Sequence, residues 1–589
     1  MERRVLIALV LSFLVLYVYQ TYIVKPVTRT PQAAGQTARP GGAAAPGGAA
    51  STTASPAGVK AEAEAPAVPA AEALVGDTAE REVRIETQDV IAVFTNRGAR
   101  LKSWRLKKYL DPQRQPQELI EKDLSTHPLP FTLATGDDRL DATLNAALYT
   151  ASDAPASPIT AATTLKFEYS DRTGVHAVKE FEFTPTSYVV TVRPTVTSGD
   201  RAVTPAIFWG PAVGDIAEVS RYTQAAEGLM FQKGGKIQRP KASDITKQPS
   251  YEGDFLYAGV DDNYFMTVAL SPGASKVVYQ PVTIGPPAGS KDPGRQLVSY
   301  SIEPKSAGQG VKFFAGPKDF DVLTAIGPSV AEAINFGYFR VIVVPLLNSL
   351  KWINGYVANY GWAIIILTVI INVIIFPLRH KSVVSMRKMQ EIQPEVKAIQ
   401  DRYAKLKATD PAKQKMNQEL MALYKDRGVN PASGCVPILL TFPLIFAFYA
   451  LLSTAIELRG APFALWIHDL STHDPYYVTP VLMGASQMVQ QWMMPATGVD
   501  PAQQKMMMFM PIMFTFMFLW APAGLALYWL VSNVWQIGQQ YATNYMIGPT
   551  AVRHVRPAAE RRVKRVGGGK SAGADARGKT ESSETESEG

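Results

Sequence analysis

Five apolar runs beyond residue 359 constrain this 589-residue chain more than any other feature. They cover about 360–378, 435–456, 477–494, 506–520 and 523–540, and none contains Asp, Glu, His, Lys or Arg. Their lengths approach the roughly 20 residues that a helix needs to cross a bilayer. The sequence therefore predicts a polytopic α-helical membrane core over 360–546, built from five transmembrane helices.

A sixth apolar run follows Arg3 and Arg4 and extends to about residue 24, with tyrosines at its far end. This pattern fits either a cleaved signal peptide or a retained membrane anchor. Because no small-residue cleavage site follows directly, we favour an anchor over 1–24, which makes six transmembrane helices. Residues 25–77 are rich in Ala, Gly and Pro, a composition that cannot bury a core and predicts a disordered linker.

Region 78–330 has the patterning of short β-strands. Apolar and polar residues alternate in "REVRIETQDVIAVFTN" and in "AVKEFEFTPTSYVVTVRPTV", which favours a large antiparallel β-sandwich. We find no catalytic motif there, and we interpret Asp261 and Asp262 as a solvated turn in preference to an acid pair. Three aromatic residues are interpreted as core in preference to a sugar-binding platform: Trp104, Trp209 and Tyr264.

The distribution of basic residues predicts the topology. Lys and Arg crowd the segment 379–430 and the start of the tail 547–589, whereas the loop 457–476 carries only Arg459. The positive-inside rule then places 379–430 and both termini in the cytoplasm, and the β domain on the outer side of the membrane. The apolar segment 335–357 is interrupted by charged residues and Pro345, so we expect an interfacial amphipathic helix there.

The cytoplasmic segment 379–430 has the pattern of a helical hairpin. Pro394 can open one helix, Asp410 and Pro411 can open the second, and Gly428 can end it. Apolar residues stripe both helices at helical spacing: Val396, Ile399, Tyr403 and Leu406, then Met416, Leu420, Leu423 and Tyr424. If the stripes pack on each other, the outward basic residues are left for lipid headgroups or RNA, and the sequence does not decide between these.

The composition argues against several classes of protein. Proton-coupled transporters usually need ionisable groups at membrane depth, and intramembrane proteases need a nucleophile with a base, a metal or an acid pair. A single cysteine, Cys435, excludes a disulfide framework and any Cys-rich metal site. With six scattered histidines besides, we expect no catalytic residue, no metal and no cofactor.

The predicted transmembrane helices instead carry uncharged polar residues on definite faces. Thr368 and Asn372 lie one turn apart, and Arg379 follows two turns later on the same face. Two further helices each carry such a face: Gln487, Gln490 and Gln491 on one, and Trp529, Asn533, Gln536 and Gln540 on the other. These residues can join helices by hydrogen bonds or can line a wet groove. Their grouping on three helices favours the groove.

A second feature is an adaptable apolar surface. The run "KMMMFMPIMFTFMFLW" is dense in Met and Phe, and another helix carries Phe442, Pro443, Phe446 and Phe448. Met adapts to varied apolar partners, although the same residues also fit ordinary packing against lipid. The Met-rich run 506–520 has fifteen residues, which at about 1.5 Å each span roughly 22 Å, less than the ∼30 Å hydrocarbon core. It therefore predicts local thinning of the bilayer.

Four stretches carry a resemblance to a known family. They are "FPLRHKSVVSMRKMQEIQP" (376–394), "MALYKDRGVNPASGCVPILLTFPLIFAFYALL" (421–452), "ELRGAPFALWIHDLSTHDPYY" (457–477) and "DPAQQKMMMFMPIMFTFMFLWAPAGLALYWLVSN" (500–533). In these the chain closely resembles the YidC/Oxa/Alb family of membrane protein insertases. The stretches "YAGVDDNYFMTVAL" (257–270) and "FFAGPKDFDVL" (313–323) resemble the large periplasmic domain of Gram-negative members.

The resemblance implies an insertase and chaperone for newly made inner-membrane proteins that acts alone or beside the Sec translocon and needs no covalent chemistry. It implies nascent membrane proteins, the Sec translocon and lipids as partners, and a ribosome contact through the hairpin and the basic tail 553–570. It also implies a hydrophilic groove open to cytoplasm and lipid, with positions at Asn372, Thr441, Gln491 and Trp529. With the polar faces above, the expected groove comprises Thr368, Asn372, Arg379, Thr441, Gln487, Gln491, Trp529, Asn533 and Gln536.

An apolar slide for the client is implied at Phe442, Pro443, Phe446, Phe514 and Phe518. One departure from the family is at Asn372, where members commonly carry a positive residue, usually Arg. Arg379 lies about 10 Å away by helix rise on the same face, so it either takes over part of that role by snorkelling or serves as a positive-inside anchor. Two other functions remain open: a solute transporter or channel, and an envelope binding protein that acts through its β domain.

Overall fold

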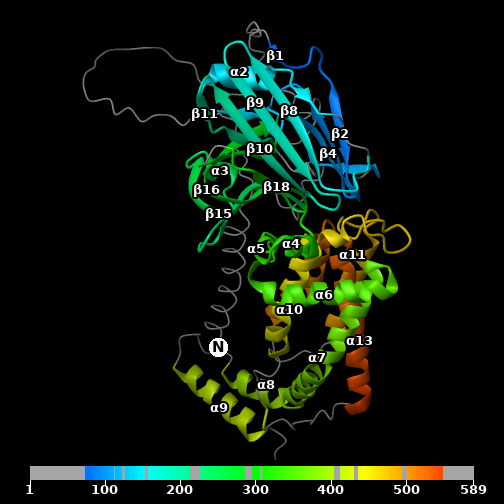
Figure 1. Ribbon diagram of the computed structural model, residues 1–589. Coiled ribbons are helices and arrows are strands. Elements are labelled where there is room, and N and C mark those ends of the chain that lie inside the picture. The colour runs from blue at the N-terminus through cyan, green and yellow to red at the C-terminus, as the bar shows by residue number, and fades with distance from the viewer. Residues whose placement is uncertain are drawn as a thin grey trace, which may run out of the picture.

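The computed structural model describes residues 73–111, 113–121, 127–152, 157–211, 226–284, 295–305, 308–403, 411–429, 436–493 and 501–547. Figure 1 shows these as a β domain at one end of the molecule and a helical part at the other. The predicted anchor 1–24 and the tail beyond residue 547 lie outside the described residues.

The β domain contains two sheets, and the strand pairs within its described residues are antiparallel. The smaller sheet has the order β2-β3-β4-β5, with β2 Glu82–Glu86, β3 Val90–Thr95, β4 Arg100–Leu110 and β5 Pro116–Glu118. The larger sheet follows the path β1-β8-β9-β10-β18-β16-β15-β13-β14. Its strands on this path are β1 Ala73–Val75, β8 Thr163–Asp171, β9 Val175–Phe183, β10 Val189–Ser198, β18 Val311–Pro317, β16 Phe265–Ile284, β15 Ser250–Asp261, β13 Glu227–Gln232 and β14 Ile237–Gln238.

Short elements complete the domain. Strands β6 Leu133–Ala134, β7 Thr150–Ala151, β11 Arg201–Val203, β12 Ala206–Trp209 and β17 Arg295–Pro304 pair at the sides of the larger sheet. Helices α2 Asp138–Ala146, α3 Ala242–Ile245, α4 Phe320–Ile326 and α5 Pro328–Ala331 accompany them. Strand β1 lies inside the segment predicted as linker, so the folded domain begins before residue 78.

Aromatic side chains fill the core between the two sheets. Phe94 of β3 lies 4.7 Å from Phe181 and 6.0 Å from Phe183, both of β9, measured between ring centroids. Trp104 of β4 stacks on Phe183 at 6.3 Å. The strict alternation of buried residues along β9 puts these rings on one face, as a pleated strand requires. The core placement predicted for Trp104, Trp209 and Tyr264 is confirmed, because none is more than 7% exposed.

Strand β16 is shared between two neighbours and directs one hairpin tip toward the helices. Residues 265–270 pair with β18, and residues 275–284 pair with β17. The strand changes partner around Gly273, which has φ +68°, a conformation that glycine adopts without steric cost. Residues 262–264 form the turn between β15 and β16, and this turn projects from the end of the sheet.

The helical part begins with η2 Gly337–Phe339 and α6 Arg340–Val357. Helix α6 runs crosswise between the β domain and the remaining helices (Figure 1). The longer helices are α7 Tyr360–Glu391, α10 Val436–Thr454, α11 Val478–Met493, α12 Pro501–Phe518 and α13 Ala523–Ile547, with η4 Ile456–Leu458 after α10. Among the described residues, α7 alone is both long and apolar enough to cross a membrane, with shorter apolar helical stretches at Phe442–Thr454 and Met508–Phe518.

Three predicted helix boundaries were wrong, and one of them is the end of α13, which lies at Ile547 and not at residue 540. Helix α7 continues for 13 residues past Leu378 to Glu391, because Pro377 is tolerated inside it and the polar sequence that follows still favours a helix. Helix α12 starts at Pro501 and has 18 residues, which at about 1.5 Å each make roughly 27 Å. It is therefore longer than the 15-residue helix predicted, which weakens the argument for a thinned bilayer.

The predicted hairpin is formed by α8 Gln393–Arg402 and α9 Ala412–Asp426. The predicted apolar stripes are confirmed as a small separate core: Val396, Ile399, Tyr403, Met416, Leu420, Leu423 and Tyr424. Two ion pairs join the helices, Arg402 to Glu419 at 2.9 Å and Arg427 to Glu395 at 2.7 Å. Leu406 and Asp410 lie outside the described residues.

Candidate functional site: a polar face between three helices

The polar residues predicted on α7 form a continuous chain along that helix. The Thr368 hydroxyl donates to the carbonyl oxygen of Ile364 at 2.6 Å, and the Asn372 amide donates to that of Thr368 at 2.8 Å. The Arg379 guanidinium donates to Asn372 Oδ1 at 3.1 Å. Arg379 therefore extends toward Asn372, back along the helix, and its charge lies beside that residue.

Helices α11 and α13 face each other through amides. Gln490 donates to Gln536 at 2.6 Å, and Asn533 donates to the Ser486 hydroxyl at 3.0 Å. The Oε1 atom of Gln487 is buried without a hydrogen-bond partner among the described residues. A buried acceptor left unpaired costs about 1–3 kcal/mol, so this atom is suited to accept from water or from a polar segment of another chain.

The end of the same face that lies toward the α8–α9 hairpin joins α13 to α7. Gln539 donates to the carbonyl oxygen of Phe376 at 3.5 Å, and Arg387 donates to Asn544 at 2.7 Å. Gln539 Oε1 and Trp535 Nε1 are buried without partners in the described part of the chain. Ser486, Trp535 and Gln539 were not among the predicted groove residues. Trp535, Gln539 and Thr543 recur every four residues along α13, and this spacing could have indicated the first two of them.

These contacts place α13 between α7 and α11, with polar groups directed into both boundaries. The arrangement offers amide and hydroxyl groups with spare hydrogen-bonding capacity and the guanidinium groups of Arg379 and Arg387. It can replace water around a polar peptide segment, and it presents no nucleophile paired with a base among the described groove residues. Gln491 is half-buried on α11, and the side chain of Thr441 lies outside the described part of α10.

The predicted apolar residues of α10 are partly exposed. The Phe442 and Phe446 rings lie 5.4 Å apart, and Phe442 is 52% exposed. Pro443 lies within the helix and is half-buried. The pair is therefore accessible from outside the bundle.

The predicted apolar residues of α12 face inward. The rings of Phe514 and Phe518 lie 5.8 Å and 5.2 Å from Trp529 of α13, and Phe518 is only 5% exposed. The outer surface of α12 is instead made by Met508, Phe509, Ile512, Met513, Phe516 and Met517. Trp529 thus lies behind this surface as part of the packing between α12 and α13.

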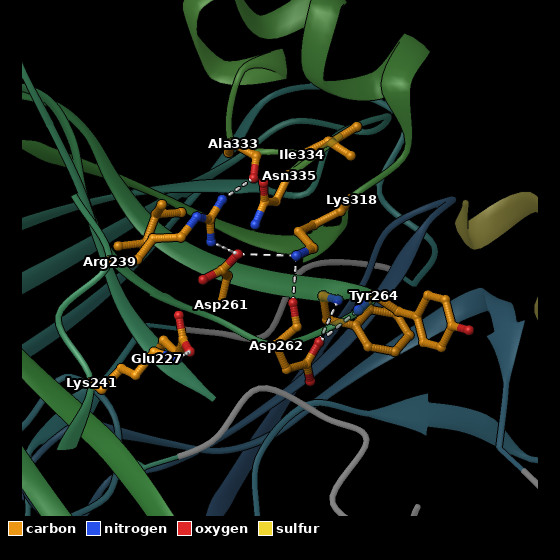
Figure 2. A network of polar contacts seen from close by, with 12 residues as sticks. Glu227, Arg239, Lys241, Asp261, Asp262, Tyr264, Lys318, Ala333, Ile334 and Asn335 are labelled. Atoms are coloured by element: carbon orange, nitrogen blue, oxygen red, sulfur yellow. Dashed lines mark hydrogen bonds and ion pairs between the residues drawn. The ribbon is translucent and has the colours of Figure 1, made fainter. Parts of the chain in front are cut away.

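A second polar cluster occupies the β domain, at residues predicted to form a solvated turn. That prediction was wrong: Asp261 is fully buried and Asp262 is 7% exposed. Asp261 Oδ2 accepts from Arg239 at 2.5 Å and from Lys318 at 3.0 Å, as Figure 2 shows. Two cations from distant parts of the chain, Arg239 and Lys318, compensate the buried negative charge. No residue near Asp261 in the sequence indicates that these cations lie beside it.

Comparisons with known proteins cover both parts of the chain. The family model described as the 60Kd inner membrane protein matches residues 352–549, and the one described as the YidC periplasmic domain matches residues 82–349. A solved structure of an active YidC insertase, with its first transmembrane domain resolved, matches with a TM-score of 0.33 and 17% identity over 80% of this chain and 95% of that chain.

Two curated relatives match over nearly their full lengths. The chain is 35% identical over 560 residues to the membrane protein insertase YidC of Geotalea daltonii, which covers 92% of this chain and 99% of the relative. It is 36% identical over 559 residues to that of Geobacter metallireducens, which covers 93% and 99%. The chain therefore belongs to the YidC family of membrane protein insertases.

Proposed function

We propose that this protein inserts newly made proteins into the bacterial inner membrane and helps them fold. The observation that carries the proposal is the polar face of α7, α11 and α13, whose buried amides keep unused hydrogen-bonding capacity inside an otherwise apolar bundle. Membership of a family whose curated relatives are named insertases supports it.

The topology we propose has six transmembrane helices, both termini in the cytoplasm and the β domain in the periplasm. The positive-inside rule supports this orientation, and the surface of α6 supports the position of that helix at a membrane–water boundary. The helix buries one apolar face, including Leu347 and Leu350, and exposes Trp352 and Tyr356, whose rings lie 5.0 Å apart. Trp and Tyr are enriched where a helix meets the membrane–water boundary. Helix α6 then lies at the outer surface, and the α8–α9 hairpin lies on the opposite, cytoplasmic side (Figure 1).

In this proposal the groove lowers the cost of moving a polar segment through the bilayer. Each backbone group that loses water without a replacement partner costs several kcal/mol in hydrocarbon. Gln487 and Gln539 supply replacement acceptors, and Arg379 supplies a charge that attracts acidic residues of the client. At about 4 Å and an effective dielectric constant of about 20, such an attraction is worth about 4 kcal/mol.

The apolar part of the client is proposed to slide into lipid along α10 and α12. Phe442 and Phe446 offer one side of this path, and the exposed Met and Phe side chains of α12 offer the other, with Phe514 and Phe518 as the layer behind them. Burial of apolar surface, worth roughly 25 cal/mol per Å², drives this step. The hairpin and the basic tail 553–570 are proposed to receive the client from the ribosome, and the Sec translocon is proposed as a partner.

Complementation of a strain depleted of its own insertase tests the proposal. The chain should restore growth and insertion, and Arg379→Ala should lower the insertion of a client with an acidic tail at least fivefold while it spares a neutral-tailed client. Lys381→Ala is the matched control, because Lys381 is an exposed cation two residues away on the same helix. Equal effects of both substitutions would mean that Arg379 is only a topological anchor.

A further inference from the structure

The β domain reaches the slide helix α10 through the tip of the β15–β16 hairpin. The Asn263 side-chain amide donates to the carbonyl oxygen of Ser453 at 3.2 Å, across 190 residues of sequence. Ser453 belongs to the last turn of α10, where carbonyl groups have no partner within the helix. Asn263 therefore acts as a C-terminal cap that another domain supplies.

The segment that follows α10 is held by the same face of the β domain. The Arg459 guanidinium donates to the Leu110 carbonyl oxygen and to Gln117 Oε1, both at 2.8 Å. It also lies 5.9 Å from the ring centroid of Tyr264 and 5.1 Å from that of Phe265, within the range of cation–π attraction. Ser453 in the last turn of α10 and Arg459, five residues past the end of the helix, are thus bound to three separate parts of the domain.

Two segments, here called arms, thus reach α10. The first arm is the β15–β16 turn that carries Asn263, and the second reaches the middle of the helix. The connector between the β domain and α6 runs through residues 331–339, and its Ala333 carbonyl oxygen accepts a hydrogen bond from Arg239. At the end of this connector, Phe339 stacks on Phe446 of α10, with ring centroids 5.7 Å apart and an interplanar angle of 6°. The proposed slide residue Phe446 therefore touches the connector directly.

Asp261 joins the two arms. Its Oδ2 atom accepts from Arg239, which holds the connector, and from Lys318. The Lys318 ammonium also donates to the Asp262 carbonyl oxygen, and Asp262 Oδ1 accepts from the backbone N–H groups of Tyr264 and Phe265, at 2.9 Å and 2.7 Å. Figure 2 shows this network extending from Arg239 through Asp261 to the turn.

Holding two strands together with this network costs free energy, because its charged groups lose their hydration on burial. Asp261 and Lys318 are both fully buried, and apolar side chains of similar volume often stabilise a fold as well as a buried ion pair does. Buried charges do, however, fix one arrangement among several, because each alternative leaves a charge unpaired. Here the arrangement that they fix is the position of the turn and the connector, the two parts that touch α10.

We propose that Asp261 is a positioning residue of the insertase: through the Asn263 cap and the Phe339–Phe446 stack, it holds α10 where its exposed phenylalanines meet the client. This inference rests on the proposed function. It gives the β domain a role in client contact that acts through the position of α10.

Site-specific photocrosslinking in liposomes tests the inference. A benzoyl-phenylalanine probe replaces either Phe442 on α10 or Phe516 on α12, and the client is a small two-span membrane protein. Asp261→Asn and Asn263→Asp should each lower the crosslinking yield at 442 at least threefold relative to 516. Asn263→Asp keeps the shape of the side chain and removes its N–H donors, and Arg84→Ala, in an exposed ion pair of the same domain, is the control.

The ratio of the two probes separates positioning from general instability. A variant that merely unfolds or inserts poorly lowers both yields together, and that result, or an unchanged ratio, would overturn the inference.

Amide exchange supplies a readout that does not depend on insertion. Exchange at the last turn of α10, residues 450–454, should become at least fivefold faster in Asn263→Asp and remain unchanged in Arg84→Ala. If the wild-type protein inserts no client, the proposed function fails. If exchange at 450–454 is the same in Asn263→Asp and the wild type, the positioning role fails, whatever the insertion assay shows.

Discussion

Removal of the Asp261 carboxylate should destabilise the β domain far more than removal of a surface charge. Asp261→Ala leaves Lys318, which is fully buried, and Arg239, whose side chain is 16% exposed, without their carboxylate. Loss of one partner of a buried ion pair costs about 3–5 kcal/mol, because the remaining charge cannot regain its hydration. Arg84→Ala removes a pair whose arginine is 58% exposed, and such pairs are worth about 0–1 kcal/mol.

Hydrogen–deuterium exchange of the full-length protein in nanodiscs measures this difference locally. Because about 1.4 kcal/mol corresponds to a factor of ten, exchange along β15 and β16 should become between about a hundredfold and several thousandfold faster in Asp261→Ala. Arg84→Ala should change exchange in its own sheet by less than about fivefold. An Asp261→Ala effect no larger than that of Arg84→Ala would refute the claim that the buried charges depend on one another.

Two further predictions concern the outer end of the helical part and the packing of its core. Burial and the charge of Asp319 raise the pKa of Glu457 to about 6, above an ordinary value of 4.5. Ionisation of Glu457 therefore lowers the free energy of unfolding by about 2 kcal/mol. This stability is present in full below about pH 4.5 and is lost as the pH rises through about 6. Glu457→Gln should raise the thermal midpoint at pH 7.5 and leave it unchanged at pH 4.5; an equal shift at both values would contradict this. A Cβ atom at Gly484 would lie 1.8 Å from Thr515 Oγ1, so Gly484→Ala should force α11 away from α12 and lower the thermal midpoint by several degrees. A Cβ atom at Gly538 meets open space, so Gly538→Ala should leave the midpoint unchanged. Equal midpoints for the two variants would contradict the packing.

The apolar runs predicted the helices of the core closely where hydrophobicity sets both ends. Helices α10 and α11 end within two residues of the predicted limits. Helices α7 and α13 continue well past their predicted ends, to Glu391 and Ile547. The residues that follow each apolar run contain no helix breaker, but they are too polar for hydrophobicity to indicate that the helix continues. The hairpin was predictable because its stripes and Gly428 are local signals.

Contacts between distant segments were not predictable from one sequence. The buried state of Asp261 depends on Lys318, 57 residues away, and on Arg239, so local polarity alone suggested a solvated turn. The relation between Asn372 and Arg379 was different, since both lie on one helix and helical spacing places them on one face. The groove and slide residues were suggested by helical faces and by the family resemblance, and their part in client contact stays a prediction.

Reconstitution in liposomes tests the central claim most directly. The purified protein, in vesicles that contain no other protein, is mixed with a small two-span membrane protein as it is synthesised, and external protease then reports which segments have crossed. An insertase with a polar groove should protect the translocated loop well above the level of empty liposomes. Protection equal to that of empty liposomes, with the insertase correctly oriented and folded, would contradict the account.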